Sequence, residues 1–324
     1  MSIQRYTASA DTTITNAYKG DLKTRGTGSN MGLADVLESF SIYGQVSSST
    51  DGVSSEKSRI LVQFPISGIS AHRTANTIPA SGSVNFFLRM YNARHAYTLP
   101  RNYTMTVQAV SRSWEEGNGT DMEGYKDITH DGAGTNWARA SEAAAWTTAG
   151  GDYHTGVYAA GTNMPRYDIT FEAGDEDIEL DITSMVEEWI AGSLSHRTNY
   201  GIGLAMSASL ESATRSYYTK KFFARSTEFF FKRPYIEARW NSAKKDDRGN
   251  FYSSSSLAPA VDNLNTIYLY NYVRGKLTNI PDVARGAIYV RLYDAAASGS
   301  VIASTPQSPV TGGHVSTGIY SASF

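Results

Sequence analysis

Several carboxylate side chains in this sequence are spaced closely enough to suggest acid–base catalysis or metal binding. Two adjacent pairs, Glu115–Glu116 and Glu187–Glu188, are of a type that could act as general acid and base. Two further clusters have oxygens that could bind calcium: Asp175, Asp177, Glu179 and Asp181, and Asp121, Glu123, Asp127 and Asp131. Adjacent helical residues diverge by about 100°, and alternate strand residues project in parallel. We therefore expect solvated carboxylates and no metal site.

Sequence motifs of nucleophilic, nucleotide-dependent and metal-dependent enzymes are missing. The chain has no G-x-S-x-G or G-x-G-x-x-G segment, no phosphate-binding loop and no H-E-x-x-H. Its six histidines do not pair at metal-ligand spacing: His72, His95, His130, His154, His196 and His314. We expect these histidines at the surface, no bound cofactor and no enzymatic activity.

One segment predicts a strand, a short helix and a second strand in succession. Aliphatic and acidic residues alternate over residues 177–182, which indicates a half-buried strand. Ser184 and Glu187 have the spacing of a capping box, and Gly192 is suited to end the helix. The N-Y-G-I-G-L sequence at 199–204 predicts a returning strand whose glycines permit close approach of the backbone.

Four parts of the chain together resemble a known family. They are residues 10–14 (ADTTI), residues 58–64 (SRILVQF), the helix segment with Asp181, Thr183, Trp189 and Asn199 to Gly201, and residues 222–226 with 233–236. In this order they resemble the DNRLRE-type β-sandwich domain, found in extracellular bacterial proteins and in structural proteins of tailed bacteriophages. The sequence differs at Pro65, where the family has an acidic residue. The resemblance implies a jelly-roll-like β-sandwich over residues 1–240.

Composition indicates about two domains that fold by packing alone. A length of 324 residues suffices to bury a core, and the absence of cysteine excludes disulfides and thiolate metal sites. Charged residues make up 19% and the net charge is −2, so the charge does not favour nucleic acid as a partner. The first residues lack a signal-peptide pattern, and no apolar run reaches the roughly 18 residues of a membrane span. We expect no membrane partner and synthesis in the cytoplasm.

Alternating apolar residues predict core strands through residues 60–64, 84–90 and 103–109. Between residues 113 and 166 the alternation lapses into a long glycine-rich excursion, in which an alanine-rich stretch near Ala143 could form a short helix. Its tryptophans favour a packed loop over disorder. They are also candidates for stacking on sugar rings, although core packing explains them equally well: Trp114, Trp137 and Trp146.

A change in composition after Trp240 predicts a domain boundary. Residues 241–263 have the charged, serine-rich composition of a linker, and residues 264–324 predict a second, smaller immunoglobulin-like β domain. The sequence ends within a predicted strand. We therefore expect the native chain to continue past Phe324.

The second domain contains an aromatic stripe. If Ile267, Leu269 and Val273 face its core, the opposite face carries residues enriched at protein interfaces. This candidate interface consists of Tyr268, Tyr270, Tyr272, Tyr289, Arg291 and Tyr293. We hypothesise that it docks onto a neighbouring subunit. Tyrosine is also a common residue on exposed strands.

The sequence therefore predicts an all-β protein with one short helix that works by attachment. The family resemblance and the missing export signal favour a virion structural protein of a tailed bacteriophage, such as a capsid decoration, fibre or tail component. Its expected partners are other virion proteins and copies of itself, and its expected location is the virion. The alternative is a carbohydrate-binding module, or a phage appendage that binds host polysaccharide. The resemblance suggests this second function because relatives of the domain bind polysaccharides.

Overall fold

A computed structural model of the protein contains two compact units, Met1–Asn241 and Ser242–Phe324. The structure describes residues 2–48, 52–95, 99–121, 134–242, 246–251, 255–259, 263–281, 288–293, 299 and 310–324. Both units are built from antiparallel strands, so the predicted all-β class is confirmed. No helix in these described ranges is long and apolar enough to cross a membrane.

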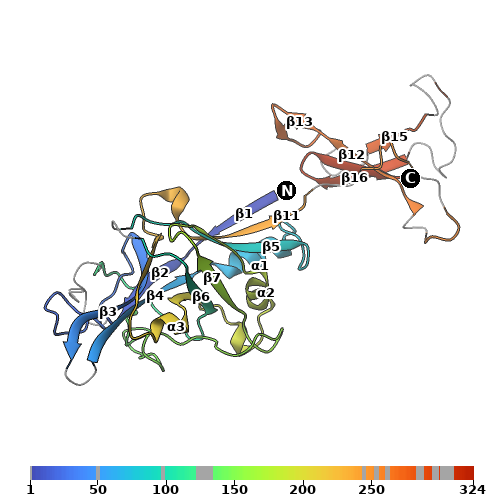
Figure 1. The fold of residues 1–324 in the computed structure, drawn as a ribbon. Coiled ribbons are helices and arrows are strands. Elements are labelled where there is room, and N and C mark those ends of the chain that lie inside the picture. The colour runs from blue at the N-terminus through green and yellow to red at the C-terminus, as the bar shows by residue number, and fades with distance from the viewer. Residues whose placement is uncertain are drawn as a thin grey trace. The chain divides into compact units, whose positions relative to one another are not determined.

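The first unit consists of two sheets. The small sheet has the order β1-β11-β5-β8: β1 Ser2–Thr7, β11 Tyr235–Trp240, β5 Val84–Met90 and β8 Ile178–Asp181. The large sheet has the order β10-β3-β4-β9-β6-β7, and β2 also pairs with β4. Its strands are β10 Tyr217–Phe223, β3 Val36–Ser48, β4 Gly52–Gln63, β9 Ile202–Met206, β6 Tyr103–Ala109, β7 Arg166–Phe171 and β2 Ala10–Thr15. Figure 1 shows the strands of this unit in one body.

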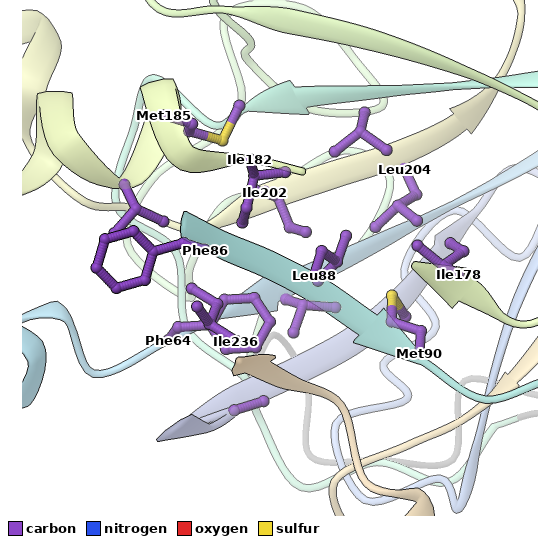
Figure 2. Packing of buried hydrophobic residues seen from close by; sticks show 14 of the residues in the cluster. Phe64, Phe86, Leu88, Met90, Ile178, Ile182, Met185, Ile202, Leu204 and Ile236 are labelled. Carbon is purple, nitrogen blue, oxygen red and sulfur yellow. The ribbon is translucent and has the colours of Figure 1, made fainter. Parts of the chain in front are cut away.

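The main core lies between these two sheets. Phe86 and Leu88 of β5 and Ile236 of β11 are fully buried and pack against β9 and β4 residues such as Leu204. Figure 2 shows these side chains directed toward one another. The predicted alternation along β5 and β6 is confirmed, because period 2 places one face of each strand in this core.

Two further α-helices accompany the one that the sequence predicts. The predicted helix is α2 Thr183–Ala191, and it ends at Gly192 with a φ of +51°. Its predicted capping box is wrong, because the N-cap is Ile182, which makes no side-chain capping hydrogen bond. The additional helices are α1 Ile66–Thr74 and α3 Ala208–Glu211, and two short 3₁₀ helices are η1 Ser195–Arg197 and η2 Phe230–Lys232. The stretch near Ala143 forms turns, contrary to the expected helix.

In its described residues, the second unit contains one four-stranded sheet and one hairpin. The sheet has the order β12-β17-β16-β15: β12 Thr266–Tyr270, β17 Ile319–Ser323, β16 Val310–Ser316 and β15 Ile288–Val290. The hairpin pairs β13 Tyr272–Val273 with β14 Lys276–Leu277. Part of the expected linker packs on this unit, since Asp246 and Asp247 accept backbone hydrogen bonds from Tyr268 and Thr266, each at 2.8 Å.

Candidate functional site

The excursion after β6 covers the outer face of the large sheet and forms a second core there. Leu61 of β4 points away from the main core and packs with Ile14, Trp137 and Trp146. Trp137 and Trp146 are only 8% and 5% exposed, and the Trp146 indole donates to the carbonyl of Asn136 at 2.9 Å. These two tryptophans therefore lack the open ring face that sugar stacking needs, which corrects that expectation for them.

Trp114 is partly buried against the same cluster. Its indole Nε1 donates to the carbonyl of Tyr200 at 2.8 Å. The predicted packed loop is thus seen over the described part of the excursion, where tryptophans fill the space above β4 and β2. Of the four carboxylates in the cluster at residues 121–131, Glu123, Asp127 and Asp131 lie outside the described residues.

A polar groove of about 690 Å³ lies beside this second core. Thr106 and Gln108 of β6 and Arg166 of β7 contribute the sheet side of its lining, and Arg112 and Tyr153 come from the excursion. The groove forms because the outer face of β6 and β7 carries polar residues where the excursion leaves the sheet uncovered. The side chains of Arg112 and Arg166 are 39% and 45% exposed, so both guanidinium groups are open to a ligand.

Arg59 fixes the inner end of the polar groove. Its guanidinium binds the carboxylate of Glu211 through two hydrogen bonds of 2.9 and 2.6 Å and the carbonyl of Gly150 at 2.8 Å. The same group lies over the ring of Trp137, 5.3 Å from its centroid. Burial raises the pKa of the Tyr153 hydroxyl to about 12, so this side chain is a neutral hydrogen-bonding group at neutral pH.

Asp152 supplies a carboxylate to the polar groove. Burial alone would raise its pKa, but backbone hydrogen bonds from Thr147 and Thr148, each at 2.9 Å, outweigh burial and lower it. The carboxylate lies 3.7 Å from the guanidinium of Arg112. The groove thus offers charges of both signs together with hydroxyl and amide groups. Such a lining favours a hydrated, hydroxyl-rich ligand over an apolar one.

Three of the four paired glutamates are held in ion pairs, contrary to the expected solvated pairs, whereas Glu115 is exposed as expected. Glu187 binds Arg73, and the buried Glu188 binds Arg197 at 2.7 Å and the backbone N–H of Gly161 at 2.9 Å. Glu116 pairs with Arg225 at 2.7 Å. Sequence reasoning missed these pairs because each arginine lies on a different element from its glutamate.

The acids along β8 also have separate partners. Glu179 forms ion pairs with Arg89 and Arg239, and Asp177 accepts a hydrogen bond from the backbone of Asn92 at 2.8 Å. Asp181 accepts the backbone N–H of Thr183 at 2.9 Å. Within the described ranges, no group of three or more histidine and acidic residues could hold a metal ion.

Several histidines are partly buried, where the sequence predicted surface positions. His72 shares a hydrogen bond of 2.9 Å with the hydroxyl of Tyr6. Burial and the neighbouring charges of Lys220 and Lys221 lower the pKa of His95 to about 4. His130 lies outside the described residues.

In the second unit, the candidate interface residues lie mostly at the surface. The exposed fractions are 70% for Tyr289, 59% for Tyr272, 40% for Tyr270 and 37% for Tyr293; Arg291 is exposed and Tyr268 partly buried. Leu269 and Val273 are also exposed, although the alternation predicted them in a core. We call these aromatic and aliphatic side chains the tyrosine face.

The predicted stripe is not one continuous strand. It breaks at Asn271, where β12 ends and the hairpin of β13 and β14 begins, so Tyr272 belongs to a different pair of strands from Tyr270. Next to β12 lies an apolar groove of about 460 Å³, lined by Ile267, Tyr268, Leu269, Ile288, Tyr289 and Val290 together with Arg248 and Ala322.

Sequence reasoning missed an aromatic turn in the first unit. Three consecutive phenylalanines, Phe229–Phe231, precede Lys232 between β10 and β11, and they are 51%, 64% and 80% exposed. The available signal was an unbroken apolar triplet between a charged residue and a Lys-Arg-Pro sequence, where no strand alternation holds.

Comparison with known proteins gives no assignment, since no family model and no curated protein matches this chain. The resemblance of residues 1–240 to the DNRLRE-type domain therefore stays a prediction.

Proposed function

We propose that this protein is a structural component of a tailed bacteriophage virion that works by docking onto neighbouring subunits. The observation that supports this function is the tyrosine face. Tyr270, Tyr272 and Tyr289 lie at the surface together with Leu269 and Val273. Tyrosine is enriched at protein interfaces, and exposed apolar side chains mark interaction surfaces when they gather on one part of a protein.

The packing of the second unit adds to this argument. In its described residues the buried hydrophobic side chains are Tyr320 and Ala322, whereas the first unit has an extensive core. A single small sheet gains little stability until a second layer covers it. The first unit would thus be stable by itself, whereas the exposed sheet of the second unit would be buried when a partner binds.

Particle incorporation tests this function directly. Replacing Tyr270 and Tyr289 by serine removes two exposed aromatic anchors, and we expect at least a tenfold loss of incorporation when particles assemble with the variant chain. Leu257→Ser is the matched control, because Leu257 is 95% exposed and outside the tyrosine face. Unchanged incorporation of the double variant, with circular dichroism showing the native fold, would remove the proposal.

A second candidate function is binding of a polysaccharide, and the polar groove favours it. Open guanidinium groups at Arg112 and Arg166, next to Thr106 and Gln108, could bind hydroxyl and carboxylate groups of a sugar chain. Glycan-array binding by the full chain tests this function, and Arg112→Ala with Arg166→Ala should abolish the signal. Arg101→Ala is the control, since Arg101 is exposed and does not line the groove. An array with no bound glycan, or a signal unaffected by the double variant, argues against it.

A further inference from the structure

The aromatic turn Phe229–Phe231 is an ordered apolar projection on the first unit. Residues 230–232 form η2, closed by hydrogen bonds from Phe230 N to Glu228 O and from Lys232 N to Phe229 O, both 2.8 Å. It is the light-orange turn that precedes β11 and projects from its unit (Figure 1). The turn therefore presents its phenylalanines on a fixed backbone.

Side-chain contacts hold two of the rings in place. Phe229 packs edge-on against Phe223 with centroids 5.4 Å apart, and Lys232 Nζ lies 4.6 Å from the Phe223 ring. Arg233 lies over Phe230 at 5.5 Å and donates to the carbonyl of Thr227 at 3.1 Å. Phe231, the most exposed ring, packs edge-on against the ring of Phe230, with centroids 5.3 Å apart. Preorganised aromatic rings of this kind are typical anchors of protein interfaces.

The second unit carries a concave surface of matching chemistry. The apolar groove beside β12 and β15 is lined by the aliphatic side chains of Ile267, Leu269, Ile288 and Val290 and by the rings of Tyr268 and Tyr289. Its volume of about 460 Å³ lies in the range of sites that enclose small organic groups. A phenylalanine ring fits the chemistry of this lining.

Charged side chains flank both surfaces: the aromatic turn carries Glu228, Lys232 and Arg233, and Arg248 of the groove pairs with Asp246 at 3.4 Å. Glu228 is exposed directly before the aromatic turn, whereas Arg248 lines the apolar groove and Arg291 is exposed next to Val290. The side chain of Arg248 is 65% exposed.

We propose that the aromatic turn of one copy inserts into the apolar groove of a second copy. This inference rests on the proposed docking function and names the partner of the tyrosine face. The two surfaces differ, so the contact is heterologous, and repetition produces a ring or an open filament. One ring in one groove buries less area than a stable interface, so each contact is weak and becomes effective when many copies are held together.

Two defective variants and their mixture test this pairing. The turn variant carries Phe230→Ser and Phe231→Ser, and the groove variant carries Leu269→Lys and Tyr289→Lys; all four positions are exposed, so the fold should persist. Val157→Ser, at a position 92% exposed outside both surfaces, is the matched control. Sedimentation velocity over a concentration series measures the size of the assemblies.

We expect wild type and control to grow into multimers with rising concentration and each defective variant alone to remain a monomer. A mixture of the two variants retains one intact turn and one intact groove, so it should form 1:1 dimers and stop there. Multimers of the turn variant like those of wild type would overturn the inference. Wild-type monomers at every concentration would do the same, and if these monomers still enter particles through Tyr270 and Tyr289, the proposed function stands while this pairing fails.

A lipid membrane is the other partner that a turn with aromatic and cationic side chains could bind. Flotation of wild-type monomers with vesicles containing phosphatidylserine, abolished in the turn variant, would overturn the pairing of two copies and assign the turn to a membrane surface.

Discussion

Arg73 of α1 and Glu187 of α2 form a bidentate ion pair through two hydrogen bonds of 2.6 Å. Their side chains are 17% and 20% exposed, so the pair is largely shielded from water. The guanidinium also lies over the ring of Phe86, 5.8 Å from its centroid. The pair therefore ties both helices to the small sheet.

Removing this pair should destabilise the first unit. We expect Arg73→Ala and Glu187→Ala each to lower the free energy of unfolding by about 1–3 kcal/mol, the range for a hydrogen-bonded charged group. Urea unfolding of both single variants and the double variant gives the coupling energy. The exposed pair of Arg166 and Asp168, with side chains 45% and 52% exposed, is the control and should couple by about 1 kcal/mol or less. Equal coupling in the two pairs would contradict the argument.

Asp11 should make stability depend on pH in the acid range. Its carboxyl is 1% exposed, and burial raises its pKa to about 7, although Oδ2 accepts the backbone N–H of Arg225 at 2.5 Å. Between the ordinary pKa of 3.8 and about 7, the folded state binds more protons than the unfolded state. Stability should therefore fall as the pH rises through this window.

The matched measurement compares wild type with Asp11→Asn. From pH 4 to pH 7.5, wild type should lose about 4 kcal/mol relative to the variant, because each pKa unit corresponds to about 1.36 kcal/mol. Thermal or urea unfolding at several pH values gives this difference. Parallel pH profiles of the two proteins would show that Asp11 titrates normally.

The spacing of apolar residues along the sequence predicted the strands and the helix end that depend only on neighbouring residues. Val84, Phe86 and Leu88 alternate with period 2 and are buried in β5, and α2 ends at its glycine as expected. Partners remote in sequence were beyond such reasoning, as for Arg73 and Glu187, which are 114 residues apart.

Other features were missed for physical reasons of their own. The helix α1 lacks a strong apolar stripe, since only Ile66 and Ile69 among its residues are buried. The groove beside Arg112 exists because the excursion covers part of a sheet face and leaves the rest open. Leu269 is exposed because the described part of the second unit has no second layer over its sheet, and alternation along a strand does not reveal the number of layers.

Gly201 should not tolerate a side chain. Its φ is +85°, and a Cβ atom there would lie 2.3 Å from the carbonyl oxygen of Val62. We expect Gly201→Ala to lower the free energy of unfolding by about 2–4 kcal/mol through backbone strain and overpacking. Gly68→Ala in α1 is the control, because no atom lies within 4 Å of the added Cβ and alanine favours a helix. A Gly201→Ala protein as stable as wild type in urea would contradict the close approach that the sequence predicts.

Lys220 is fully buried, and its ammonium group uses all three donors. Nζ donates to Asn92 Oδ1 at 2.8 Å and to the carbonyls of Gly174 and Glu176 at 2.9 and 2.7 Å. Burial nevertheless lowers its pKa from 10.5 to about 8, because removal from water disfavours the charged form. Between these two values the unfolded state binds more protons than the folded state, so the contribution of Lys220 to stability rises with pH.

Comparing the stability of wild type with that of Lys220→Met isolates this effect, because methionine has a similar length and no charge. The tyrosines that also titrate at alkaline pH are present in both proteins, so their contribution cancels. From pH 7.5 to 11, wild type should gain about 3 kcal/mol in unfolding free energy relative to the variant. Urea unfolding at half-unit pH steps measures the gain. A difference between the two proteins that stays constant over this range would mean that the three oxygen acceptors fully offset the burial of the charge.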